Sequence, residues 1–105
     1  MSSLSGIPVS SQFFPKDRVY NWPNPVHGGT TFIRYFVKEN SGVRITIFDI
    51  AGDLVTELSA SGIGGVDNEV PWDTGGVQSG IYFARIEATG PGGSGVAIIK
   101  IAVVK

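Results

Sequence analysis

The stretch Val43-Arg-Ile-Thr-Ile-Phe-Asp-Ile-Ala-Gly-Asp-Leu-Val55 decides the fold class. Apolar and polar residues alternate in its first part, from Val43 to Ile47, and a β-strand places alternate side chains on opposite faces of a sheet. The turn Ala51-Gly52-Asp53 follows, where glycine supplies the positive φ that tight hairpins demand. The stretch therefore predicts a strand with one buried face and a hairpin into a second strand.

The same pattern extends outward over most of the chain. Short apolar segments alternate with breaks rich in glycine, proline and asparagine at spacings of roughly ten residues, and no helical period is sustained. The predicted strands are Val19–Trp22, Thr31–Val37, Val43–Asp49, Leu54–Leu58, Glu69–Trp72, Ile81–Ala88 and Val96–Val104. They predict an all-β fold, an immunoglobulin-like antiparallel β-sandwich of about seven strands.

Alternation within these strands also predicts the core. The side chains expected between the two sheets are Ile45, Ile47, Trp72, Tyr82, Ile86, Ile99 and Ile101. Tyr82 stands at the start of the penultimate strand, where a plain core tyrosine and a tyrosine corner of the kind that sandwiches use fit equally well.

The length of 105 residues predicts one domain. Residues 1–17 are rich in serine with glycine and proline, so we expect a linker or N-terminal extension there and the sandwich domain over residues 18–105. Phe13-Phe14 interrupts the linker composition and is expected to dock on the domain. The start of the chain shows no signal peptide, so a secreted or cell-surface location would make the chain part of a larger precursor.

The composition argues against nucleic-acid binding and against attachment to a membrane. The net charge is −1, with 42% hydrophobic and 16% charged residues and no cysteine. Near-neutral charge argues against nucleic acid as a partner and against a polybasic membrane anchor. Apolar runs such as Val96–Ile99 and Ile101–Val104 reach only four residues, which is too short for insertion into a membrane.

Catalytic chemistry finds little support in the sequence. His27 is the only histidine and stands in a glycine-rich loop without a recognisable serine elbow, so we predict no catalytic residues and no enzyme activity. One histidine without cysteine cannot form a zinc site, and no cofactor motif is present. Calcium stays open through oxygen ligands such as Asp67, Asn68, Glu69 or Asp73, although their spacing matches no EF-hand.

Three segments, read in order, carry a resemblance to a known family. They are Tyr20-Asn-Trp-Pro-Asn-Pro-Val26 with the following Thr30-Thr-Phe-Ile-Arg-Tyr35, the hairpin Ile45–Val55, and Trp72-Asp73 with Ser79-Gly-Ile-Tyr-Phe-Ala-Arg-Ile86. In this order and spacing they resemble the C-terminal sorting domain of the type IX secretion system and the related flagellar hook-capping immunoglobulin-like domain. The match covers about residues 18 to 105.

The resemblance implies a function without catalysis. It implies a C-terminal sorting or anchoring domain of a larger secreted or cell-surface protein, recognised by an outer-membrane secretion machinery. The partner would then be protein, either that machinery or the upstream domains of the parent. Two alternatives stay open: an accessory module that attaches the parent to polysaccharide or to another protein, and a hook-capping-like structural assembly domain.

The residues of the motifs have structural interpretations. Pro23 and Pro25 hold the residues before them extended, and asparagines beside them can hydrogen-bond the neighbouring backbone. Asp49 can accept N–H bonds across its hairpin, and Gly80 is expected to allow a sharp turn into the penultimate strand. The candidate structural residues are Trp22, Pro23, Asn24, Pro25, Asp49, Gly52, Trp72, Asp73, Gly80 and Tyr82.

The last predicted strand is apolar on its outward side as well as on its inward side. The candidate partner-facing residues are Val96, Ile98, Lys100, Ala102, Val104 and Lys105. An edge strand with apolar side chains invites strand addition by another chain, and lysines at the edge limit indiscriminate pairing. The competing interpretation is that Phe13-Phe14, or a preceding domain, covers this face.

Overall fold

The computed structural model describes residues 13–105, so the first part of the predicted linker, residues 1–12, lies outside the described residues. A short 3-10 helix, η2 (Lys16–Arg18), precedes seven strands. The strands are β1 (Tyr20–Trp22), β2 (Thr30–Phe36), β3 (Ser41–Asp49), β4 (Leu54–Gly62), β5 (Asp67–Asp73), β6 (Gly80–Gly90) and β7 (Gly93–Val103). Each predicted strand is confirmed, and β4 and β7 differ most from the predicted ends.

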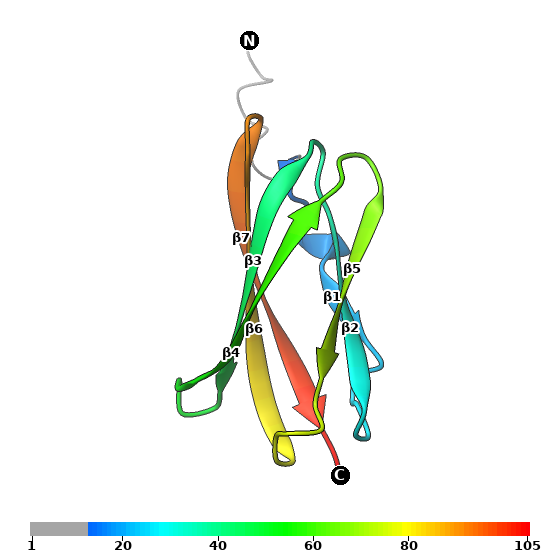
Figure 1. Cartoon of the computed structure of the whole chain (residues 1–105), viewed down its shortest axis with the longest axis vertical. Coiled ribbons are helices and arrows are strands. Elements are labelled where there is room, and N and C mark those ends of the chain that lie inside the picture. The colour runs from blue at the N-terminus through cyan, green and yellow to red at the C-terminus, as the bar shows by residue number, and fades with distance from the viewer. Residues whose placement is uncertain (1–12) are drawn as a thin grey trace.

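The strands form two antiparallel sheets that face each other as an immunoglobulin-like sandwich (Figure 1). One sheet has three strands in the order β1-β2-β5, and the other has four in the order β4-β3-β6-β7. The edge strands of the larger sheet are therefore β4 and β7. No helix among residues 13–105 is long and apolar enough to cross a membrane.

The inward faces meet as the alternation predicts. Ile45, Ile47, Ile86 and Ile101 are fully buried, and Ile99 is partly buried against the same cluster. Trp72 on β5 and Tyr82 on β6 belong to opposite sheets, and their rings meet edge to face with centroids 5.6 Å apart. Edge-to-face geometry is favoured by the aromatic quadrupole, so this pair contributes to holding the sheets together.

A second connection between the sheets is polar. The Tyr35 hydroxyl on β2 donates to the Ser61 carbonyl oxygen on β4 over 2.9 Å. Burial raises the pKa of Tyr35 above its ordinary value, so the hydroxyl keeps the proton that it donates. The sandwich is therefore joined by a hydrogen bond as well as by apolar packing.

Phe13 and Phe14 close one end of the core. Both are 1% exposed, and the Lys38 amide donates to the Phe13 carbonyl oxygen over 2.9 Å. Gly95 makes room for Phe14, because a Cβ at that position would lie 2.9 Å from the Phe14 Cβ, and Phe13 lies beside Gly93. The expected docking is confirmed, and the core begins N-terminal to residue 18, whereas the domain boundary itself stays a prediction.

The position of these two phenylalanines corrects one interpretation. They fill the space between the sheets on the inward side of β7, whereas Ile98 on the outward side is 63% exposed. Phe13-Phe14 therefore does not cover the outward face of the last strand. The physical reason is that Gly93 and Gly95 leave room for the two phenyl rings inside the sandwich, where the rings lose far more contact with water than they would on an open face.

We predict that Trp72→Ala lowers the free energy of unfolding by roughly 3–5 kcal/mol, because it removes a buried aromatic side chain and its contact with Tyr82. Urea denaturation followed by circular dichroism measures the loss. Trp22→Ala is the matched control: Trp22 is 63% exposed, and its removal should cost less than about 1 kcal/mol. Equal losses in the two variants would show that the register of β5 is wrong.

Candidate functional site: the bracketed C-terminal strand

The last strand, β7, has one paired edge and one outer edge. It pairs with β6 over its whole length, from Gly80↔Val103 to Gly90↔Gly93. In an antiparallel ladder the backbone groups of alternate residues point away from the neighbouring strand. Ala102 is such a residue, and the alternation places the groups of Val96 and Ile98 on the same outer edge. These groups need partners of their own.

The segment Asn24–Val26 supplies partners for one half of that edge. The Asn24 Nδ2 donates to the Lys100 carbonyl oxygen over 3.0 Å, and its Oδ1 accepts from the Ala102 amide over 3.0 Å. The Val26 amide donates to the Ala102 carbonyl oxygen, and the Val104 amide donates to the Val26 carbonyl oxygen, both over 2.8 Å. We call this segment the bracket. A primary amide presents an N–H donor beside a carbonyl acceptor, and the edge of a strand offers the complementary C=O and N–H groups.

The bracket is itself held by a small polar network. The Asn24 Nδ2 also lies 3.1 Å from the Asn21 Oδ1, and the Asn21 Nδ2 donates to the Thr31 Oγ1 over 3.0 Å. The Thr31 hydroxyl donates in turn to the Pro23 carbonyl oxygen over 2.9 Å. Asn21 and Thr31 are buried, and a buried polar group is costly unless it is hydrogen-bonded. The network therefore fixes the position of the Asn24 amide.

Sequence reasoning found part of this arrangement. Asn21 approaches the neighbouring Pro23 carbonyl oxygen over 3.4 Å, in line with the local role expected for it. The reach of Asn24 to β7 was missed, because its partners stand 76 and 78 positions further along the chain. In the sequence, the only indication of this contact is an Asn-Pro pair in a chain whose last predicted strand lies at a sheet edge.

The final residue is tied to the connection between β5 and β6. The Lys105 amide donates to the Ser79 Oγ over 2.9 Å, and its Nζ donates to the Gly75 carbonyl oxygen over 3.1 Å. The Tyr82 hydroxyl on β6 donates back to the carbonyl oxygen of Gln78 in the same connection, over 2.7 Å. This is the geometry of a tyrosine corner. The Trp72–Ile86 motif thus supports the end of the chain.

Two acidic residues of the motifs hold turns. The Asp49 Oδ1 accepts from the Ala51 and Asp53 amides, both over 2.9 Å, and Gly52 has a φ of +88°. The Asp73 Oδ1 accepts from the Gly75 amide over 2.8 Å. These are the structural roles that short carboxylates take in turns.

Gly80 differs from its expected role. It begins β6 without a φ in the left-handed region, and an added Cβ would make only an ordinary contact with the Tyr82 ring at 4.0 Å. The turn into β6 does not depend on a missing side chain, because Gly80 already has strand geometry.

The outward face of β7 is open to solvent. Val96, Ile98 and Val104 are 37%, 63% and 44% exposed, and Lys100 is also exposed. Ala102 is half-buried beside the bracket. Among residues 13–105, none pairs with the outer edge between Gly93 and Ile98. The structure thus places Val96, Ile98, Lys100 and Ala102 on the outward side of β7, with Val104 exposed just beyond it, whereas Lys105 turns to the connection between β5 and β6. Half of the outer edge has no partner among residues 13–105.

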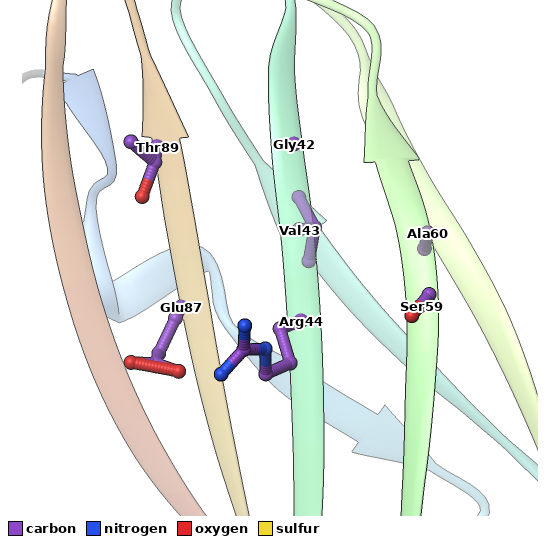
Figure 2. Close-up of a pocket in the computed structure, with 7 residues that line it drawn as sticks. All are labelled: Gly42, Val43, Arg44, Ser59, Ala60, Glu87 and Thr89. Atoms are coloured by element: carbon purple, nitrogen blue, oxygen red, sulfur yellow. The ribbon is translucent and has the colours of Figure 1, made fainter.

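A hollow of about 390 Å³ lies on the outer face of the larger sheet. Figure 2 shows Arg44 on β3 extending toward Glu87 on β6. Arg44 also lies 3.8 Å from Glu57, and Glu87 lies 2.6 Å from Arg85. The charges are balanced by ion pairs, and the hollow is wide open, so it presents an ordinary solvated sheet surface.

The acidic residues considered for calcium are used in other ways. Asp67 pairs with Arg18 over 2.7 Å, and Glu69 pairs with Arg34 over 2.8 Å. The Asn68 side chain hydrogen-bonds the backbone of the loop before it. Within the part of the chain that the structure describes, no three acidic, histidine or cysteine side chains gather in a geometry suited to a metal ion.

The comparisons with known proteins agree with this architecture. The family model described as "Secretion system C-terminal sorting domain" matches residues 20–101. Among solved structures, dimeric latent PorU from Porphyromonas gingivalis is similar over 82% of this chain at 30% identity, with a TM-score of 0.67. The match takes up 9% of the PorU chain, so this chain spans a small part of that protein. No curated protein sequence matches the chain.

More distant likenesses show the fold alone. A β-glucuronidase from Parabacteroides merdae matches over 87% of this chain and 14% of its own, at 7% identity and a TM-score of 0.59. The same enzyme with glycerol in its active site matches over 86% and 13%, at 8% identity and a TM-score of 0.56. At such low identity the likeness is one of sandwich architecture.

We predict that Asn24→Ala lowers the free energy of unfolding by about 1–2 kcal/mol, because it leaves the Lys100 carbonyl and the Ala102 amide without their partner. Asn24→Asp should be no better, since a carboxylate keeps the acceptor but cannot donate to Lys100. The control is Ser94→Ala on the free half of β7, which should change stability by no more than about 0.5 kcal/mol. Equal unfolding midpoints for Asn24→Ala and Ser94→Ala would contradict the bracket.

Proposed function

The chain belongs to the family of secretion system C-terminal sorting domains, and from this membership we propose that it is the type IX export address of a larger protein whose other domains precede it. Such domains mark proteins that are secreted or held at the cell surface, and their role is not catalytic. Any activity of the parent would then reside in the upstream domains. The partner of this domain is protein of the secretion machinery.

The observation that carries the proposal is the convergence of the family's motifs on the C-terminal strand. The Asn24-Pro25 motif pairs with the edge of β7, and the Trp72–Ile86 motif supports Lys105. Two motifs far apart in sequence therefore hold one short segment at the end of the chain. This supports an address that is read from the folded domain, because the last strand is presented in one geometry only when the sandwich has formed.

We further propose that the machinery reads the free half of β7. Its outer edge, from Ser94 to Ile98, has no backbone partner among the described residues 13–105, and Val96 and Ile98 project beside it. An extended segment of a partner could add as a further strand there, with main-chain hydrogen bonds for affinity and side-chain contacts for specificity. The bracket covers the edge over Lys100–Val104, so it limits strand addition to the part of β7 before Lys100.

A fusion assay tests the export role. A reporter is placed upstream of Met1 and expressed in a type IX-competent host, with and without the domain. We expect the reporter in the medium or at the cell surface only when the domain is present. Equal secretion in both cases would reject the sorting function.

Ile98→Lys tests the recognition surface separately from folding. Because Ile98 is 63% exposed, the variant should change the free energy of unfolding by no more than about 0.5 kcal/mol while it lowers export of the fused reporter. Ser59→Lys on the outward side of β4, the other edge strand of the same sheet, is the matched control and should leave export unchanged.

Two results would contradict the recognition surface. A loss of two or more kcal/mol in Ile98→Lys, as expected of a core position, would show that this face is internal. Unchanged export by a folded Ile98→Lys protein would show that the machinery reads another part of the domain, while the fusion assay would still report on the sorting function itself.

A further inference from the structure

We propose that the outward face of the three-stranded sheet binds a neutral, extended polysaccharide by stacking of sugar rings on its aromatic side chains. This face lies on the opposite side of the sandwich from the outward face of β7, and the inference is independent of the export role (Figure 1). We call it the aromatic face. Its residues are Tyr20, Trp22, Phe32, Arg34, Phe36, Glu69 and Pro71.

The register of the strands builds this face in rows. Trp22 stands opposite Phe32, and Phe32 stands opposite Pro71, which makes one apolar row across all three strands. In the next row Tyr20 stands opposite Arg34, and Arg34 stands opposite Glu69. Neighbouring strands lie about 4.8 Å apart, so each row is a nearly continuous surface.

Two aromatic residues of this face are exposed to an extent that folding does not require, while Phe32 and Phe36 are half-buried beside them. Trp22 is 63% exposed and Tyr20 is 47% exposed, whereas the other tryptophan, Trp72, is 4% exposed in the core. A solvated antiparallel sheet face usually carries polar residues. A group of exposed aromatic side chains with polar groups beside it is typical of a binding surface.

The charges of the face favour a neutral ligand. The Arg34 Nε donates to the Glu69 Oε1 over 2.8 Å, and Arg18 beside the face pairs with Asp67 over 2.7 Å. Each guanidinium is thus already matched by a carboxylate, and an anionic polymer would have to displace that carboxylate. A hydroxyl-rich neutral chain can instead hydrogen-bond the ion pairs as they stand.

The polar groups are also held in place. The Arg34 Nη1 donates to the Tyr20 hydroxyl oxygen over 3.3 Å, so Tyr20, Arg34 and Glu69 are linked across three strands. The hydrogen bond with Tyr20 is the main cause that raises the pKa of Arg34 above its ordinary value, and the hydrogen bond with Glu69 adds to it. Further along the face the Arg18 guanidinium lies 4.0 Å from the centre of the Phe36 ring. Side chains fixed in this way lose little freedom on binding.

The chemistry of pyranose sugars fits such a surface. A pyranose ring with equatorial hydroxyls has flat faces of C–H groups, and their hydrogens match the negative face of an aromatic ring. Its hydroxyls project at the sides, where the Arg34–Glu69 pair offers both a donor and an acceptor. An open sheet face without walls suits a ribbon-like β-1,4-linked chain, whose ring faces can stack on the exposed Trp22 and Tyr20 side chains.

Native affinity electrophoresis of the full chain tests the proposal, with hydroxyethyl cellulose and glucomannan as neutral probes and alginate as an anionic one. We expect retardation by at least one neutral polymer and none by alginate. Trp22→Ala should abolish the retardation and Tyr20→Ala should weaken it, with thermal midpoints measured to show that both variants fold. Leu54→Ala, which removes an equally exposed apolar side chain outside this face, should bind as the unmodified chain does.

The proposal is overturned if neither neutral polymer retards the chain, if alginate retards it equally, or if a folded Trp22→Ala protein still binds. Size-exclusion chromatography of the same samples tests one other occupant of the face. A dimer that Trp22→Ala converts to a monomer would assign the aromatic face to contacts between copies of this chain, and would also overturn the proposal.

Discussion

The hydrogen bonds between the Asn24–Val26 bracket and the outer edge of β7 are the interaction on which the rest of this structure depends. A sandwich that is not closed into a barrel must end in edge strands, and their backbone groups attract other chains. Here one side-chain amide and one backbone segment cover the edge at Lys100–Val104, while the edge before Lys100 has no partner among residues 13–105. The bracket therefore separates a closed half of the strand from an open half.

This division connects the fold to its role as a sorting domain. The segment that covers the edge comes from the beginning of the domain, and the strand that it covers comes from the end. Phe13 and Phe14 add a second link of this kind, since they pack beside Gly93 and Gly95 of β7. If the machinery reads the β7 edge as proposed above, the address exists only in the folded state, and the machinery would thereby select domains that have completed folding.

Local patterns predicted the parts of this structure that local physics controls. Alternation placed Ile45, Ile47 and Ile86 in the core, and the turn chemistry of Asp49 and Gly52 was read correctly from their sequence. Contacts that depend on which distant strands lie side by side could not be predicted from the sequence. The pairing of β1 with β2 and of β2 with β5 creates the aromatic face, and neither register can be read from residues such as Trp22 and Pro71 taken separately.

Hydrogen exchange of individual β7 amides in the unmodified chain tests the central claim most directly. The account predicts slow exchange at Ala102 and Val104, whose amides donate to the bracket, and fast exchange at Val96 and Ile98, whose amides point to the open edge. The amides of Ala97 and Ile99, which face β6, provide the internal reference for a paired position. Equal protection of all four outer-edge amides, or fast exchange at Ala102 and Val104, would contradict the bracketed strand.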